Sequence, residues 1–290
     1  MLNVEQIEKS FGSQKILKGV SFNINSGEIY GLIGKNGAGK TTLMNIMAGL
    51  SSADSGSCTL NGKPISTENN ILKIGYLPDL PSFFEYLTTG EFLDYLLMGR
   101  EEKRRRTLLQ LVELDDKVKI STMSRGMRQR LGIAAAIVND PDVILLDEPT
   151  SALDPSGRAD VMRVLNTLKH EGKAIILSTH ILADMERVCD QVGFLSDGII
   201  KKNIKVSELQ EGCAYVRVTF AENQIDSHIF ELAGLQFEVT GGMYRFALDQ
   251  KDILVSQKKL LNVLAGLDIE IASIHNESNN LDKLFEEVCG

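Results

Sequence analysis

The stretch GKNGAGKTT, residues 34–42, decides the fold of this chain. It follows the apolar segment EIYGLI and precedes the helical pattern TTLMNIMAG, so we expect it to join a strand to a helix. Gly34, Gly37 and Gly39 allow backbone torsions that turn successive N–H groups inward, which forms an anion nest. A helix that begins near Gly39 adds its positive end. The stretch therefore predicts a phosphate-binding loop.

The side chains of this loop indicate the ligand. Lys40 can reach the β- and γ-phosphates of a nucleoside triphosphate, and the Thr41 hydroxyl can ligate Mg²⁺. A glycine-rich turn without a ligand is the alternative, but the strand before the loop and the helix after it disfavour that reading. We expect ATP and Mg²⁺ as cofactors, with these nucleotide-binding residues: Gly34, Asn36, Gly37, Ala38, Gly39, Lys40, Thr41 and Thr42.

A second group of polar residues follows two apolar strands. VILLDE, residues 143–148, places Asp147 and Glu148 where a buried strand ends, and their side chains point to opposite faces. Asp147 is predicted to hold Mg²⁺ through water, and Glu148 to orient or polarise the attacking water. STH, residues 178–180, ends the next strand and brings His180 to the same edge, where α/β sheets bind ligands. We predict Glu148 and His180 as catalytic residues; a turn start and a structural histidine are the alternatives.

Composition limits the remaining classes. The chain has 290 residues and a net charge of −8, which disfavours a nucleic-acid partner. Its four cysteines (Cys58, Cys189, Cys213 and Cys289) lie far apart, so we expect reduced thiols and no structural zinc. Neither a membrane-spanning apolar run nor a signal peptide is evident, and a cytoplasmic location is expected. The basic run at 103–106 is read as a solvated helix face.

The pattern along the chain predicts two domains. Short strands fill residues 1–30, and Asn61-Gly62 indicates a hairpin. Helical spacing covers 84–122 and again 124–139; apolar strands joined by a helix at about 156–170 then indicate a parallel sheet. After about 210 the order becomes β-α-β-β-α-β plus a last helix, with a hairpin turning on Gly241-Gly242, which fits a small ferredoxin-like unit.

The stretch MSRGMRQR, residues 123–130, completes a set of motifs with a family resemblance. In order and spacing, GKNGAGKTT, MSRGMRQR, ILLDEP, SALD (151–154) and His180 resemble the Walker A loop, signature loop, Walker B strand, D-loop and switch histidine of the ATP-binding cassette of ABC transporters. The resemblance covers about residues 1–205. It implies an α/β, P-loop NTPase fold with a parallel core sheet, an antiparallel β subdomain and a helical subdomain at about 84–140. We therefore divide the chain into a cassette, 1–210, and an accessory α+β domain, 211–290.

The same resemblance assigns roles to residues that the loop alone does not explain. Ser124 can cap a helix whose positive end faces outward, and Gly126 allows a phosphate to come close. In such cassettes this helix end meets ATP held by a facing copy, which implies a two-fold pair with two ATP molecules between the copies. Phe11, in the context KSFG, matches the aromatic residue that stacks on adenine.

Two departures from the family pattern stand out. Asp79, in IGYLPD, replaces the usual glutamine; an aspartate there can ligate Mg²⁺ directly. Met123, Arg125 and Met127 replace the usual Leu, Gly and Gln of the signature, and Arg125 either adds a charge at the facing phosphate or points to solvent. Because Glu148 and His180 are intact, we still expect ATP hydrolysis. A heterodimer with one weak site is the alternative to a homodimer.

The function implied is that of an ATP-hydrolysing transporter subunit. It would dimerise on ATP and power a separate polytopic membrane permease, so the chain would be peripheral on the inner face of the cell membrane. The single cassette and the ending NNLDKLFEEV look most like the bacterial drug, bacitracin and lantibiotic exporter branch (ABC-2 type), which implies export of a drug, peptide or lipid-like substrate. The alternatives are a soluble ABC-type ATPase acting on nucleic acid or ribosomes, and a P-loop kinase.

Overall fold

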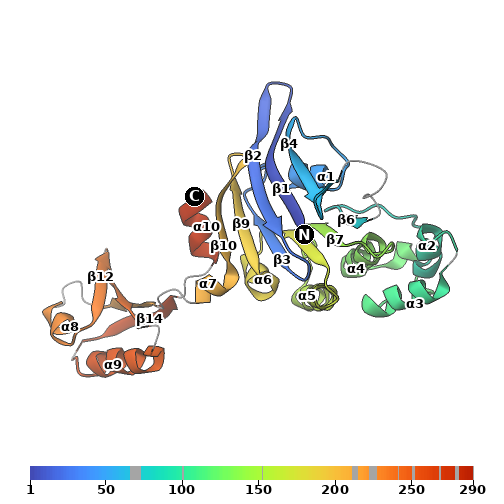
Figure 1. Ribbon diagram of the computed structural model, residues 1–290. Helices are drawn as coiled ribbons and strands as arrows, with labels where there is room; N and C mark the ends of the chain where they lie inside the picture. Colours follow the sequence, from blue (N-terminus) through green and yellow to red (C-terminus); the bar gives the residue numbers. More distant parts are fainter. Residues whose placement is uncertain are drawn as a thin grey trace. The chain divides into compact units, whose positions relative to one another are not determined.

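The computed structural model describes residues 1–65, 73–99, 101–151, 153–210, 215–221, 227–240, 242–249, 252–267, 269–277 and 281–289. Its chain divides into two compact units, Met1–Lys205 with Phe285–Gly290, and Val206–Leu284 (Figure 1). The sequence places the division between 210 and 211, and that boundary stays a proposal. Cys213, Gly241 and Ala152 of the SALD stretch lie outside the described residues.

A six-stranded sheet forms the centre of the first unit, in the order β10-β9-β3-β8-β7-β6. Five neighbouring strands are parallel, and β10 pairs with β9 antiparallel. The strands are β3 (Ile29–Ile33), β6 (Ile74–Leu77), β7 (Val143–Asp147), β8 (Ala174–Ser178), β9 (Gln191–Ser196) and β10 (Ile199–Lys205). Every residue of β3, β7 and β8 is buried, as the continuous apolar runs predict for parallel strands covered on both faces.

An antiparallel sheet in the order β2-β1-β4-β5 packs in the same hydrophobic core. Its strands are β1 (Leu2–Phe11), β2 (Gln14–Ile24), β4 (Ser55–Leu60) and β5 (Lys63–Pro64). The turn between β4 and β5 has positive φ at both central residues, 51° at Asn61 and 76° at Gly62. That geometry suits a two-residue hairpin, so the hairpin predicted from Asn-Gly is confirmed.

Six α-helices belong to the first unit up to Lys205 in the described part of the chain. They are α1 (Lys40–Met47), α2 (Thr89–Leu96), α3 (Glu102–Leu111), α4 (Arg125–Ala136), α5 (Pro155–His170) and α6 (Leu182–Val188). Helices α2, α3 and α4 pack against one another and form the helical part expected at about 84–140 (Figure 1). Helix α4 ends at Ala136, three residues before the predicted end at 139, and residues 137–139 form a turn.

The basic run on α3 corrects one sequence prediction. Arg104 donates a 2.6 Å hydrogen bond to the carbonyl of Ile137, and Arg105 pairs with both Asp94 and Asp116. These contacts tie α3 to α2 and to the end of α4. Arg104 and Arg105 therefore hold α3 in place, and reading the run as a solvated face was wrong for these two arginines. Lys103 and Arg106 are exposed, as that reading expects.

The second unit carries its own sheet and core. Its elements are α7 (Val206–Gln210), β11 (Tyr215–Phe220), α8 (His228–Leu232), β12 (Gln236–Thr240), β13 (Met243–Ala247), α9 (Ile253–Ala265), β14 (Ile271–Glu277) and the start of α10 (Leu281–Cys289). The strands pair antiparallel in the order β12-β13-β11-β14, over a core that contains Val218, Phe230, Phe246 and Leu260. This is the β-α-β-β-α-β order that the sequence predicts, and the ferredoxin-like assignment stays a proposal. None of the described helices is both long and apolar enough to cross a membrane.

Candidate nucleotide-binding site

The loop between β3 and α1 has the conformation that its glycines predict. Gly37 and Gly39 have φ values of 82° and 106°, and Gly39 is the N-cap of α1 in the left-handed region. A Cβ at Gly34 would lie 2.4 Å from the carbonyl oxygen of Leu195, so this position also excludes a side chain. The loop therefore directs the free N–H groups at the start of α1 toward the space above it, where an anion is stabilised.

Lys40 is held inside this loop. Its side chain is buried, and Nζ donates a 2.7 Å hydrogen bond to the carbonyl of Gly34 and a 3.3 Å one to that of Lys35. Both acceptors belong to the loop that would surround a phosphate group. The ammonium is therefore already positioned at the place where the β- and γ-phosphates of a nucleotide are expected.

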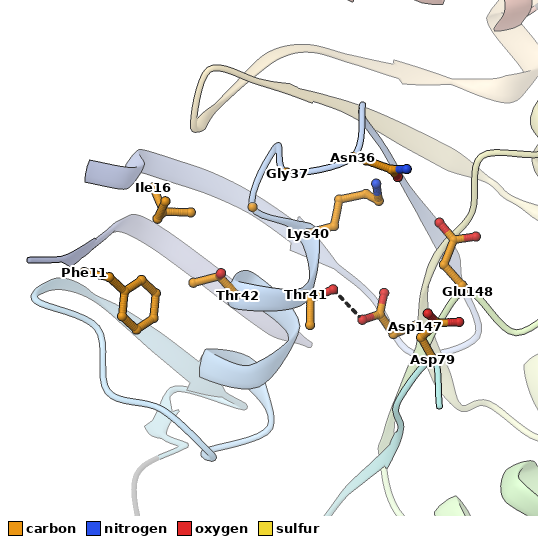
Figure 2. A pocket seen from close by; sticks show the side chains of 11 residues that line it. Phe11, Ile16, Asn36, Gly37, Lys40, Thr41, Thr42, Asp79, Asp147 and Glu148 are labelled. Atoms are coloured by element: carbon orange, nitrogen blue, oxygen red, sulfur yellow. Dashed lines mark hydrogen bonds between the residues drawn. The ribbon is translucent and has the colours of Figure 1, made fainter. Parts of the chain in front are cut away.

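A carboxylate from β7 meets the hydroxyl at the start of α1. Thr41 Oγ1 donates a 2.7 Å hydrogen bond to Asp147 Oδ2 (Figure 2). Ser178 Oγ donates a 2.6 Å bond to Asp147 Oδ1. Asp147 is only 2% exposed. Carboxylate and hydroxyl oxygens are the ligands that Mg²⁺ prefers, so Thr41 and Asp147 fit a magnesium ion that also binds phosphate.

Glu148 and His180 are brought together at the next position. His180 Nδ1 lies 2.9 Å from Glu148 Oε2, and the histidine side chain is 64% exposed. The backbone N–H of Glu148 bonds the carbonyl of Ser178, and Glu148 has a positive φ of 52°. Such a conformation costs a non-glycine residue about 1–2 kcal/mol and is found preferentially at functional sites. The sequence anticipates that both side chains reach this edge, but not that they contact each other.

Lys40, Thr41, Asp147 and Glu148 line one cavity of about 340 Å³. His180 is not among the lining residues and reaches the cavity only through its contact with Glu148. Figure 2 shows Lys40, Asp147 and Glu148 at one end of it and Phe11 at the other, which leaves room for phosphates and a base respectively. Phe11 is 57% exposed, so its ring is accessible to a ligand, and Lys9 Nζ lies 5.4 Å from the ring centroid. The predicted residues that line the cavity are Phe11, Asn36, Gly37, Gly39, Lys40, Thr41, Thr42, Asp79, Asp147 and Glu148.

Ile16 also lines the cavity, and sequence reasoning missed it. It lies on β2, where a half-buried isoleucine looks like an ordinary core residue. Its position follows from the hairpin that pairs β1 with β2 near Phe11, a register that the sequence does not show in advance. Gly34 and Ala38 belong to the loop but do not line the cavity, and Ala38 packs against the hydrophobic core.

Asp79 lies at the end of β6, next to β7 in the sheet. Its Oδ1 accepts a 3.3 Å hydrogen bond from Ser151, which connects it to the segment after Glu148. Burial raises the pKa of Tyr76 to about 12, and the charges of Asp147 and Asp79 add to this shift. The shift is consistent with both carboxylates lying near this one phenol at the polar end of the cavity.

Ser124 and Gly126 lie at the start of α4, away from the lining of the nucleotide cavity. Ser124 caps α4 and accepts a 3.2 Å hydrogen bond from the N–H of Met127, yet neither it nor Gly126 lines the cavity. Ser124 and Arg125 are exposed. The start of α4 is thus a second helix N-terminus that is open to solvent.

The fold and this cavity define a nucleotide-binding P-loop ATPase. Residues 17–151 match the family described as ABC transporter. The chain is 36% identical over 288 residues to the uncharacterized ABC transporter ATP-binding protein sll0415 of Synechocystis, which covers 94% of this chain and 78% of the relative. It is 31% identical over 301 residues to the bacitracin transport ATP-binding protein BcrA of Enterococcus faecalis, which covers 100% of this chain and 96% of the relative.

The solved structures agree with these relatives. The ATP-binding cassette MJ0796, in a dimeric post-hydrolysis state bound to ADP and Pi, has a TM-score of 0.64 and 26% identity, over 71% of this chain and 99% of that chain. The 290-residue chain described above belongs to the family of ABC transporter ATP-binding subunits. It is an ATP-binding ATPase cassette, and the P-loop kinase alternative is excluded.

Proposed function

We propose that two copies of this chain close on two ATP molecules and drive export through a separate polytopic permease. The observation that carries the proposal is the exposed start of α4, a helix N-terminus outside the chain's own nucleotide cavity. A Cβ at Gly126 would meet Leu153 at 3.7 Å and Ser124 Oγ at 4.0 Å, both ordinary contacts, and no positive φ requires a glycine there. Packing within the chain therefore does not explain Gly126, whereas close approach of a phosphate from a facing copy does.

Each catalytic group has a defined part in this proposal. The loop N–H groups and Lys40 bind the phosphates of ATP. Thr41, Asp147 and Asp79 would hold Mg²⁺, which would supply positive charge near the γ-phosphate. Glu148 orients the attacking water and accepts its proton, since its carboxylate lies at the polar end of the cavity. His180, now bonded to Glu148, contacts the γ-phosphate when ATP is bound. Phe11 stacks on the adenine.

The transport role rests on relatives. The bacitracin transport ATP-binding protein named above aligns with the whole of this chain, including the second unit. We therefore infer a drug, peptide or lipid-like substrate, and a location at the inner face of the membrane through the permease. A cassette that acts on nucleic acid or ribosomes without a permease is disfavoured by the net charge of −8.

The test of the facing pair is Glu148→Gln. This variant keeps the size of the side chain but cannot accept a proton, so turnover is expected to fall at least about 100-fold while ATP traps a dimer on size-exclusion chromatography. Glu171→Gln, an exposed position after α5, is the matched control and should leave turnover unchanged. A Glu148→Gln protein that stays monomeric at saturating ATP would contradict the proposal.

The permease is tested by purifying the chain from membranes in mild detergent. A stoichiometric polytopic protein is expected in the same complex. Recovery of the chain with ribosomes or nucleic acid, and without such a protein, would favour the alternative.

A further inference from the structure

A second polar pocket lies in the first unit, between helices α5 and α6. It has a volume of about 410 Å³, within the range of about 300–1,000 Å³ usual for small-molecule sites. One face of α5 lines it with Arg158, Met162 and Arg163, and α6 lines it with Asp184 and Arg187. None of these residues belongs to the nucleotide cavity described above.

Asp184 is the first unusual feature of this pocket. Only 6% of the residue is exposed, and its Oδ2 has no hydrogen-bond partner among the described residues. It also forms no ion pair with any arginine of the described part of the chain, although arginines line the same pocket. Buried carboxylates are nearly always paired or hydrogen-bonded, because burying an unpaired charge is costly. We therefore expect a hydrogen-bond donor for the Asp184 carboxylate to come from a molecule outside the chain.

Two arginines of the pocket lack a carboxylate partner. Arg158 is half-buried and donates through Nε to the carbonyl of Leu153 at 3.1 Å, but no described carboxylate pairs with it. Arg187 is exposed and makes neither a hydrogen bond nor an ion pair within the described residues. Arg163 differs, because Glu113 and Asp160 already neutralise it. The pocket thus holds one anionic and two cationic groups that form no ion pair within the described residues.

We propose that the α5–α6 pocket binds a small zwitterion, a molecule that carries an ammonium group and a carboxylate or phosphate. The ammonium pairs with Asp184, and the anionic group accepts hydrogen bonds from Arg158 and Arg187, whose planar guanidinium groups suit both anions. The carbon atoms between the charges pack on Met162, which is buried. An anion alone would leave Asp184 unpaired, and a cation alone would leave both arginines unpaired, so one ligand with both charges fits best.

The test uses two probes on the full chain: γ-aminobutyrate for the carboxylate form and O-phosphoethanolamine for the phosphate form. Binding is followed by the ¹³C-methyl NMR signal of Met162, assigned with Met162→Leu, and by calorimetry. At least one probe is expected to shift this signal, and acetate, inorganic phosphate and ethylamine should bind at least about tenfold more weakly. No shift with either probe at millimolar concentration would overturn the proposal, as would equal binding of a singly charged compound.

Single substitutions then test the contribution of each charged side chain of the pocket. Asp184→Asn and Arg187→Gln are each expected to weaken the bound probe about 10- to 100-fold, the usual effect of losing a hydrogen-bonded charge. Arg163→Gln is the matched control and should change affinity less than twofold, because Arg163 is already paired. Arg187 is exposed, so its variant remains informative if Asp184→Asn does not fold. Unchanged affinity in Arg187→Gln would refute the assignment.

Discussion

Gly126→Ala separates the stability of the single chain from the stability of the ATP-bound pair. Gly126 is the second residue of α4, and a Cβ there would meet Leu153 at 3.7 Å and Ser124 Oγ at 4.0 Å, both ordinary contacts. Nothing in the described chain has to move to accept a methyl group. If a phosphate from a facing copy approaches this backbone, however, the same methyl group stands in its way.

The two effects have opposite signs. Alanine is a better helix former than glycine by up to about 1 kcal/mol, and less near a helix end, so the nucleotide-free chain should be unchanged or slightly more stable. A methyl group forced into a close-packed contact costs about 1–3 kcal/mol. A two-fold pair contains two such contacts, so the dimer should lose about 2–6 kcal/mol, or at least about 30-fold in its dissociation constant.

Two measurements check this prediction. Thermal unfolding without nucleotide should show a midpoint no lower than that of the parent chain. Analytical ultracentrifugation with ATP, in the Glu148→Gln background, should show a much weaker dimer. A full-strength dimer would refute the idea that Gly126 faces a nucleotide, and a large loss of thermal stability would show that the glycine is needed within the chain.

The other predictions concern single contacts. Lys40→Ala removes the buried ammonium and should abolish ATP binding measured by calorimetry; unchanged affinity would exclude its role. Asp79→Gln removes one negative charge from the polar end of the cavity and should weaken Mn²⁺ several-fold in an EPR titration with nucleotide, since charge count sets cation affinity; equal Mn²⁺ binding would mean that the charge of Asp79 does not contribute to cation affinity. Tyr30→Phe removes a 2.5 Å hydrogen bond to Asn203 and should cost about 1 kcal/mol, or roughly 2–4 °C of melting temperature; an unaltered melting curve would show that water replaces the bond.

The sequence predicts those parts of the fold that depend on local pattern. The apolar runs at β3, β7 and β8 indicate buried parallel strands, and Asn61-Gly62 indicates its hairpin, because backbone preference and burial act over a few residues. The phosphate loop is predictable for the same reason. Its function depends on torsions and on a helix start that nine consecutive residues specify.

Contacts between segments that are far apart in the sequence cannot be predicted from local pattern. Arg105 joins Asp94 and Asp116, and nothing in a run of basic residues reveals those partners. Ile16 enters the nucleotide cavity only through the register of β1 with β2. The unpaired oxygen of Asp184 likewise becomes visible only when every neighbour in space is known. In each case the deciding quantity is a distance across the fold rather than a pattern along the chain.

The polar groups of the nucleotide cavity share one property that bears on how the cassette works. Lys40 bonds the Gly34 carbonyl, Thr41 bonds Asp147, and Glu148 bonds His180. ATP and Mg²⁺ must therefore replace internal hydrogen bonds when they bind. Each new contact contributes only the difference between its own free energy and that of the internal hydrogen bond it replaces. This exchange keeps the net binding energy moderate. The proposed pair, which would have to open again after hydrolysis, needs that moderation, because a ligand bound at full strength would hold the two copies closed.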